Sequence, residues 1–263
     1  MTENNRRLRL DWRTTCLKLA FLSFFWCSAV APTLAQDKER LAIELEGGPV
    51  WQTRNDVRIP NETGTEFSLV DTIGKGPYGA FRVEVGFDIN ERHGFRVVIA
   101  PLNIEDSSTL DTSVFFAGET FDPDVATDAN YKFSSYRFTY RYRFYNGPTW
   151  RWKVGFTGFI RDARIALRQG DTFAEDTDVG FVPLAHLRGE ARISDRWRFL
   201  LDFDGLGASQ GRAFDVAAKM GYALSDRWEL AFGYRTIEGG ADVEQVYNFA
   251  WLHSAVGSIR FNF

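Results

Sequence analysis

The chain ends in FAWLHSAVGSIRFNF, from Phe249 to Phe263, and this stretch alternates between two kinds of side chain. One set of alternate positions holds Phe263, Phe261, Ile259, Gly257, Ala255, Trp251 and Phe249. The other set includes Asn262, Arg260, Ser258 and Ser254. Because successive side chains of a strand point to opposite faces, the stretch is predicted to be a strand with one apolar and one polar face.

The same alternation recurs along the chain and is clearest between Tyr131 and Tyr145. An aromatic face there holds Tyr136, Phe138, Tyr140, Tyr142 and Phe144, and the opposite face holds Arg137, Thr139, Arg141 and Arg143. Aromatic residues make up 16% of the chain, yet no stretch beyond residue 35 approaches the ~20 apolar residues of a membrane-spanning helix. These features predict an all-β protein, a closed antiparallel transmembrane β-barrel with an apolar lipid face and a polar lumen.

The polar faces of these strands carry charges of both signs. An Arg or Lys on the lipid face near the midplane would cost about 2–4 kcal/mol, so we place these side chains in the lumen. The predicted lumen set is Arg82, Glu84, Asp88, Arg137, Arg141, Arg143, Arg188, Glu190, Arg192, Asp202, Asp204, Asp215 and Lys219. The alternation changes phase between Ile160 and Arg164, which predicts a β-bulge there.

Four short turn sequences set the number of strands. They are Asn90-Glu91-Arg92-His93, Tyr145-Asn146-Gly147-Pro148, Ser194-Asp195-Arg196-Trp197 and Ser225-Asp226-Arg227-Trp228. Longer acidic connections, such as 105–130, lie between them, and short turns are typical of the periplasmic end of an outer-membrane barrel. Four hairpins with a first and a last strand predict ten strands, approximately 40–52, 79–89, 94–105, 131–145, 150–166, 181–193, 197–206, 213–224, 227–238 and 247–263. Eight strands is the alternative, because 40–78 is weakly patterned.

The N-terminus has the three parts of an export signal. Basic residues precede the apolar run LAFLSFFWCSAVA at 19–31, and Thr33-Leu34-Ala35 provides a cleavage site. We predict a cleavable signal peptide over 1–35 and a barrel domain over 36–263; an uncleaved N-terminal anchor is the alternative. Both cysteines, Cys16 and Cys27, lie in the signal, so the mature chain has no thiol and no cysteine-based metal site.

The charge balance bears on partners. The whole chain has a formal net charge of −4, and removing the basic signal makes the remainder more acidic. This argues against a nucleic acid as partner. Charges of both signs in a narrow bore favour a salt-bridge network that fills the lumen, with a non-enzymatic structural or ligand-binding role for the barrel. The alternative is a narrow solute channel whose surplus of Arg favours anions.

Three groups of residues have the types found in enzyme or metal sites, and each also has a purely structural interpretation. Asp202 and Asp204 point inward two residues apart, near the outer end of their strand. The omptins, a family of ten-stranded outer-membrane proteases, carry acidic pairs and a His-Asp pair at the barrel mouth. Here His186 is the only inward His and no His-Asp dipeptide exists, so the two aspartates are interpreted as partners of lumen Arg residues. His253 and Ser254 are adjacent and therefore face opposite ways, which prevents a dyad. The acidic loop with Asp122, Asp124 and Asp128 lacks the spacing of a calcium loop, so Asp and Glu there are interpreted as a solvated surface. We predict no catalytic residues, no cofactor and no metal site, and keep a lipid or peptide hydrolase as a further alternative.

The signal, the alternating strands, the SDRW turns and the terminal Arg260-Phe261-Asn262-Phe263 together resemble small bacterial outer-membrane β-barrel proteins, over essentially the whole mature chain. The resemblance implies that Phe261 and Phe263 belong to the C-terminal signal read by the barrel-assembly machinery. It also implies an outer-membrane location in contact with membrane lipid and lipopolysaccharide. Gly257 stands one position earlier than the usual glycine of that signal. We expect a monomer.

Overall fold

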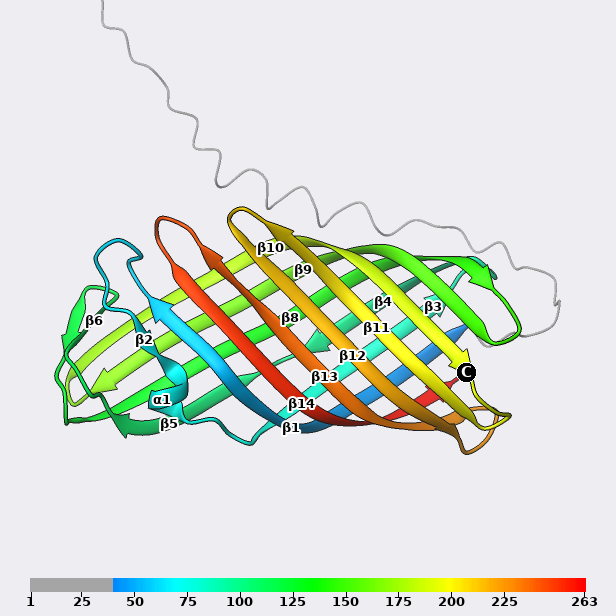
Figure 1. Ribbon diagram of the computed structural model, residues 1–263, viewed down its shortest axis with the longest axis horizontal. Helices are drawn as coiled ribbons and strands as arrows, with labels where there is room; N and C mark the ends of the chain where they lie inside the picture. Colours follow the sequence, from blue (N-terminus) through cyan, green and yellow to red (C-terminus); the bar gives the residue numbers. More distant parts are fainter. Residues whose placement is uncertain (1–39) are drawn as a thin grey trace, which may run out of the picture. The chain divides into compact units, whose positions relative to one another are not determined.

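The computed structural model describes residues 40–263, so the predicted signal peptide lies outside the described residues. These residues form an antiparallel sheet that closes into a barrel (Figure 1). Closure occurs because β1 (Leu41–Arg58) pairs with β14 (Tyr247–Asn262) on one side and with β3 (Tyr78–Asp88) on the other. Within residues 40–263, no helix is long and apolar enough to cross a membrane.

Ten strands cross the barrel. Besides β1, β3 and β14 they are β4 (His93–Ala100) with its continuation β5 (Asn103–Thr109), β8 (Ala126–Asn146), β9 (Trp150–Gln169), β10 (Thr172–Arg192), β11 (Trp197–Ala208), β12 (Gly211–Ala223) and β13 (Trp228–Asp242). The sheet has twelve strands, but β5 extends β4 along β8 and the two-residue β2 (Phe67–Ser68) only adds to β1. The prediction of ten strands is confirmed and the eight-strand alternative is wrong.

Four short turns gather at one end of the barrel, with the C-terminus, and we call this the turn end (Figure 1). The first residue of three of them stabilises the turn through its side chain. Asn90 Oδ1 accepts hydrogen bonds from the backbone N–H of Arg92 and of His93, both at 2.9 Å. The Oγ atoms of Ser194 and Ser225 each accept from the N–H of a following Trp at 3.1 Å. These are the local bonds that make Asn and Ser frequent in tight turns.

The opposite end is covered by a cap, which we define as residues 59–77 and 110–125. It contains β2, the helix α1 (Leu69–Ile73), β6 (Val114–Phe116) and β7 (Glu119–Phe121). Ser68 caps the N-terminus of the helix, and its Oγ accepts a hydrogen bond from the N–H of Val70 at 3.2 Å. Apolar cap side chains pack on inward side chains of the long strands; this cluster includes Leu69, Ile73, Phe116, Phe121, Ile165 and Leu167.

Strand β8 shows how polarity is arranged along the barrel. Near the turn end its outward side chains are aromatic, with Phe138 55% exposed, and its inward side chains Arg137, Thr139 and Arg141 are buried. Near the cap the arrangement is reversed, because inward Tyr131 is buried while outward Lys132 is partly exposed and ion-paired. Side chains alternate inward and outward along the whole strand, but the outward ones are apolar near the turn end and polar near the cap.

The same reversal explains the change of pattern at Ile160–Arg164, where a β-bulge was predicted. That prediction is wrong, because β9 pairs with β10 along its whole length and with β8 through this region without a register shift. The shifts lie elsewhere, between Arg143 and Tyr145 and between Gln52 and Arg54. The polarity of the two faces changes along β9, while the backbone keeps its register.

Candidate functional site

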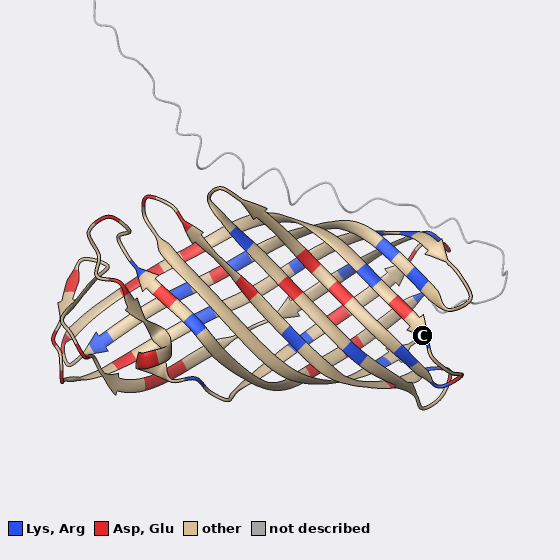
Figure 2. Ribbon diagram, in the orientation of Figure 1, with Lys and Arg blue, Asp and Glu red and all other residues tan. Residues whose placement is uncertain are grey.

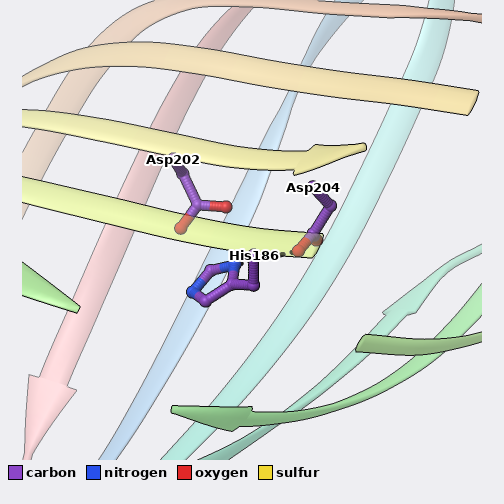
Figure 3. A group of neighbouring side chains, drawn as sticks. All are labelled: His186, Asp202 and Asp204. Atoms are coloured by element: carbon purple, nitrogen blue, oxygen red, sulfur yellow. Dashed lines mark hydrogen bonds and ion pairs between the residues drawn. The ribbon is translucent and has the colours of Figure 1, made fainter. Parts of the chain in front are cut away.

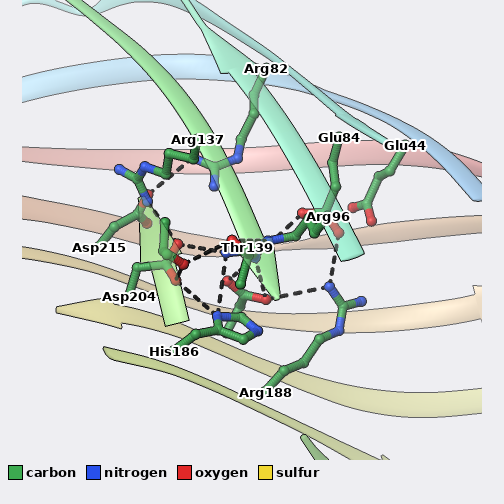
Figure 4. Close-up of polar contacts among 12 residues, drawn as sticks. Glu44, Arg82, Glu84, Arg96, Arg137, Thr139, His186, Arg188, Asp204 and Asp215 are labelled. Atoms are coloured by element: carbon green, nitrogen blue, oxygen red, sulfur yellow. Dashed lines mark hydrogen bonds and ion pairs between the residues drawn. The ribbon is translucent and has the colours of Figure 1, made fainter. Parts of the chain in front are cut away.

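A buried network of charged side chains fills the barrel near its middle and turn end (Figures 2 and 4). Arg96 on β4 is its centre and is fully buried. Its Nη1 donates to Asp202 Oδ1 at 2.8 Å, and its Nη2 donates to Asp204 Oδ2 at 2.6 Å. The two aspartates lie on β11, which β8, β9 and β10 separate from β4 around the barrel wall. These bonds therefore cross the bore.

Asp215 on β12 forms a second centre. Its carboxylate forms ion pairs with Arg82 of β3 at 3.0 Å, Arg137 of β8 at 2.8 Å and Arg235 of β13 at 2.5 Å. Arg137 also reaches Asp204 at 3.0 Å and so joins the two centres. Arginine suits such sites, because its planar group donates in several fixed directions at once.

Strand β1 supplies the acidic partners on a third side. Lys219 Nζ donates to Glu44 Oε1 at 2.5 Å and to Glu46 Oε2 at 2.7 Å. Arg235 Nε donates to Glu46 Oε1 at 2.7 Å. Each carboxylate thus faces at least one cation, as buried charges require.

Towards the turn end the network continues, with buried arginines paired to carboxylates that are partly exposed. Asp88 lies 2.9 Å from Lys153, 3.4 Å from Arg141 and 3.6 Å from Arg143. Four further ion pairs complete the network: Arg188 with Glu84 at 3.1 Å, Arg188 with Asp202 at 3.3 Å, Arg188 with Glu190 at 3.1 Å and Arg151 with Glu190 at 3.3 Å.

The structure thus brings together twelve of the thirteen predicted lumen residues. The exception is Arg192, the last residue of β10, whose side chain is 65% exposed and pairs with Asp195 of the neighbouring turn at 2.6 Å. Placing it in the lumen was wrong, because at the strand end its long side chain reaches solvent.

The predicted lumen set lacks six members of this network, which are Glu44, Glu46, Arg96, Arg151, Lys153 and Arg235. The signal for Arg96 was present, since it alternates with Phe95 and Val97, which face outward. The sequence could not show that Arg96 is fully buried, because its partners Asp202 and Asp204 lie on a strand distant in the chain.

His186 lies against this network, paired in register with Asp204 on the adjacent strand (Figure 3). Its Nδ1 is 2.8 Å from Asp204 Oδ1. Within residues 40–263, His186, Asp202 and Asp204 are the one group of His and carboxylate side chains with ligand atoms close enough for a metal, within 4.8 Å of one another. The Arg96 guanidinium already binds both carboxylates, so a positive group stands where a cation would bind.

The same burial bears on hydrolysis. Asp204 lies in the half of β11 away from the turn end, as predicted, and Asp202 lies at the middle of the strand, but Asp204 and His186 are each 1% exposed and covered by Arg96 and Arg137. His253 faces outward, with Nε2 2.9 Å from Thr53 Oγ1, whereas Ser254 is buried on the inward face.

Above the network, towards the cap, the barrel holds a cavity of about 790 Å³. Its floor includes Arg137 and Asp215, and the Arg137 guanidinium lies 4.9 Å from the ring centre of Phe159. Its inner wall is mainly apolar and includes Phe133, Phe159, Leu184, Ile237, Ala250 and Leu252.

The barrel wall beside this cavity is incomplete. Strands β10 and β11 pair only from Ala185–Gly205 to Arg192–Arg198, so the part of β10 nearer the cap pairs with β9 alone. The β11–β12 hairpin ends well short of the cap, whereas β9 and β10 run on to it (Figure 1). Pro183 lies two residues beyond the last pair and has no N–H to offer, which suits a free edge. We call this opening the side gap.

Comparison with known proteins gives a fold and no family. No family model matches the chain, and no curated protein matches it. Among solved structures, the outer-membrane protease OmpT of Escherichia coli is similar, with 9% identity and a TM-score of 0.51 over 88% of this chain and 99% of that chain. Also similar is the translocator domain of the autotransporter NalP of Neisseria meningitidis, with 11% identity and a TM-score of 0.42 over 86% of this chain and 90% of that chain. Neisserial surface protein A has 12% identity and a TM-score of 0.37 over 85% of this chain and 97% of that chain. The chain has the fold of bacterial outer-membrane β-barrels.

Proposed function

We propose that this chain is an integral outer-membrane protein whose barrel is sealed, and that it has a non-enzymatic, ligand-binding role in its outer half. The belt of exposed apolar side chains supports the membrane location; it includes Phe81, Phe138, Phe156, Leu187, Trp228 and Phe232. The likeness of fold to an outer-membrane barrel supports it too. With the turn end in the periplasm, the cap lies on the extracellular side of the membrane.

One observation carries the sealed lumen. The ion pairs of Arg96, Asp215 and Lys219 join strands from opposite parts of the wall, so the side chains meet across the bore instead of lining it. An ion passing through would have to separate several buried ion pairs. Removal of one partner from a buried pair costs about 3–5 kcal/mol, which indicates how large that barrier is.

The network also favours this role over the two alternatives. An anion channel needs arginines whose charge faces the path, but Arg96, Arg137 and Arg235 are each held by carboxylates. A hydrolase needs a reachable base, but His186 and Asp204 are enclosed. Because these groups are enclosed, we propose that the protein is not an enzyme.

The proposed partners are outer-membrane lipid, lipopolysaccharide and, during biogenesis, the barrel-assembly machinery. Phe261 and Phe263 support the last, because they lie together at the turn end with ring centres 4.6 Å apart, and Phe263 N–H donates to Leu41 O at 2.9 Å. The C-terminal aromatics thus lie at the seam that closes the barrel. We propose a monomer.

Conductance in a planar bilayer tests the sealed lumen. We expect no steady current from the wild-type protein. A variant with Arg96, Arg137, Asp202 and Asp204 all changed to Ser removes equal numbers of each charge, and we expect it to conduct.

That variant also shows that the barrel inserts under the conditions used. Heat-modifiable mobility on electrophoresis checks the folding of both proteins. A steady wild-type current of similar size to that of the variant would contradict the proposal.

A further inference from the structure

We infer that the cavity binds the hydrocarbon chain of a single-chain amphiphile, which enters sideways from the outer leaflet through the side gap. This inference rests on the proposed membrane location. The occupant is a fatty-acyl chain of the kind carried by a free fatty acid. No part of the path leads through the charged network.

The cavity wall indicates an apolar occupant. Phe133, Phe159 and Leu184 present apolar side chains on the inward face, where the same strands nearer the turn end carry Arg141, Lys153 and Arg188. The floor charges, Arg137 and Asp215, are bound to each other and to other partners. An apolar wall offers water few hydrogen bonds, so a hydrocarbon gains more from the space than water does.

The size of the cavity limits the occupant. At about 790 Å³ it lies in the ~300–1,000 Å³ range of small-molecule pockets. A single alkyl chain is a guest of this class, whereas a whole lipid with several chains is much larger. We therefore assign one chain to the cavity.

The side gap lies where the apolar belt ends. On β10, Phe181 is 70% exposed and Val179 is 72% exposed, and Phe181 lines the cavity together with Leu206 of β11. Next to Val179 on β9 stands Asp162, which is ion-paired with Lys132 and marks the start of the polar surface. A chain in the outer leaflet would thus meet an apolar entrance at its own depth.

The unpaired strand edges also indicate that the side gap lies at the boundary between hydrocarbon and the polar surface. Unpaired backbone groups cost several kcal/mol in hydrocarbon, so a wall gap is tolerated only where water or polar groups are near. Arg161 and Asp178 form an ion pair on the cavity lining, and Arg212 pairs with Glu238 at 2.7 Å on its other side. These polar groups lie at the boundary where the head of an amphiphile would remain.

Photocrosslinking tests the inference. The full protein is reconstituted in phosphatidylcholine vesicles with a trace of diazirine-tagged palmitic acid, irradiated, digested and analysed by mass spectrometry. We expect labels on inward residues such as Phe133 and Leu184, which excess oleic acid reduces at least tenfold. Labels on outward residues such as Phe138 should decline far less, because they report bulk lipid contact.

A cavity-filling variant and a matched control sharpen the test. Ala163→Trp places a large ring on the inward lining, and we expect at least a tenfold loss of inward labelling. Ala255→Trp puts the same ring on the outward face of β14, away from the side gap, and should leave inward labelling unchanged. Ala213→Phe is a second filling variant on the opposite wall, should Ala163→Trp not fold.

The outcomes separate the two proposals. Outward labelling without inward labelling, or inward labelling that Ala163→Trp and Ala213→Phe leave intact, would overturn the cavity assignment and leave the membrane location standing. Absence of labelling on outward residues as well would overturn the membrane location. Inward labelling of equal strength by a trace of diazirine-tagged phosphatidylcholine in the same vesicles would show that a diacyl lipid fills the cavity, which also overturns the single-chain assignment.

Discussion

The two halves of strand β8 have the same backbone and opposite polarity. Residues 136–144 turn aromatic rings outward and Arg, Thr and Arg inward, whereas residues 126–134 turn polar groups outward and Tyr131 and Phe133 inward. The first half is built as a membrane strand and the second as a strand of a water-soluble protein. The point at which polarity reverses therefore marks the edge of the apolar belt, and β8 continues through it unbroken.

The largest expected effect comes from removing the cation at the centre of the charged half. Arg96→Ala leaves Asp202 and Asp204 buried with fewer partners, and we expect a loss of about 3–5 kcal/mol in the free energy of unfolding. Urea unfolding in vesicles, followed by tryptophan fluorescence, measures it. Arg192→Ala is the control, because that exposed side chain should contribute less than about 1 kcal/mol. Equal effects of the two substitutions would contradict a central role for Arg96.

A lysine scan on the outward face of β8 tests the reversal itself. Phe138→Lys puts a charge into the apolar belt and should cost about 2–4 kcal/mol if it lies near the membrane midplane. Asn130→Lys, on the same face nearer the cap, should change stability by less than about 0.5 kcal/mol. The same unfolding assay in vesicles compares them. If both substitutions cost the same, the two halves do not meet different solvents.

The smallest effect is expected at the turn end. Ser225→Ala removes the Oγ that accepts from the Trp228 N–H, and should cost about 0.5–1.5 kcal/mol in unfolding free energy. Ser194→Ala should have a similar effect, because the Ser194 turn has the same geometry. Asp226→Ala, inside the turn, serves as the control. An effect at one serine and none at the other would show that the turns are not equivalent.

Much of this fold follows from local alternation. The period of two assigned Arg137, Asp202 and Lys219 to the inward face, and the turn sequences gave the number of strands. Where the assignment failed, the cause was local too. Arg192 reaches solvent from a strand end, and the change of pattern after Ile160 records a change of solvent, which mimics a bulge in the sequence.

The order of residues along each strand indicates which of its faces is apolar, because side-chain direction alternates with every residue. The arrangement of the strands in space sets the other features: Arg96 contacts Asp202 and Asp204, His186 is enclosed, and β10 leaves β11 at Ala185 to open the side gap. These features depend on the order, tilt and relative lengths of strands far apart in the chain. Alternation within a strand carries no information about which side chains meet across a bore.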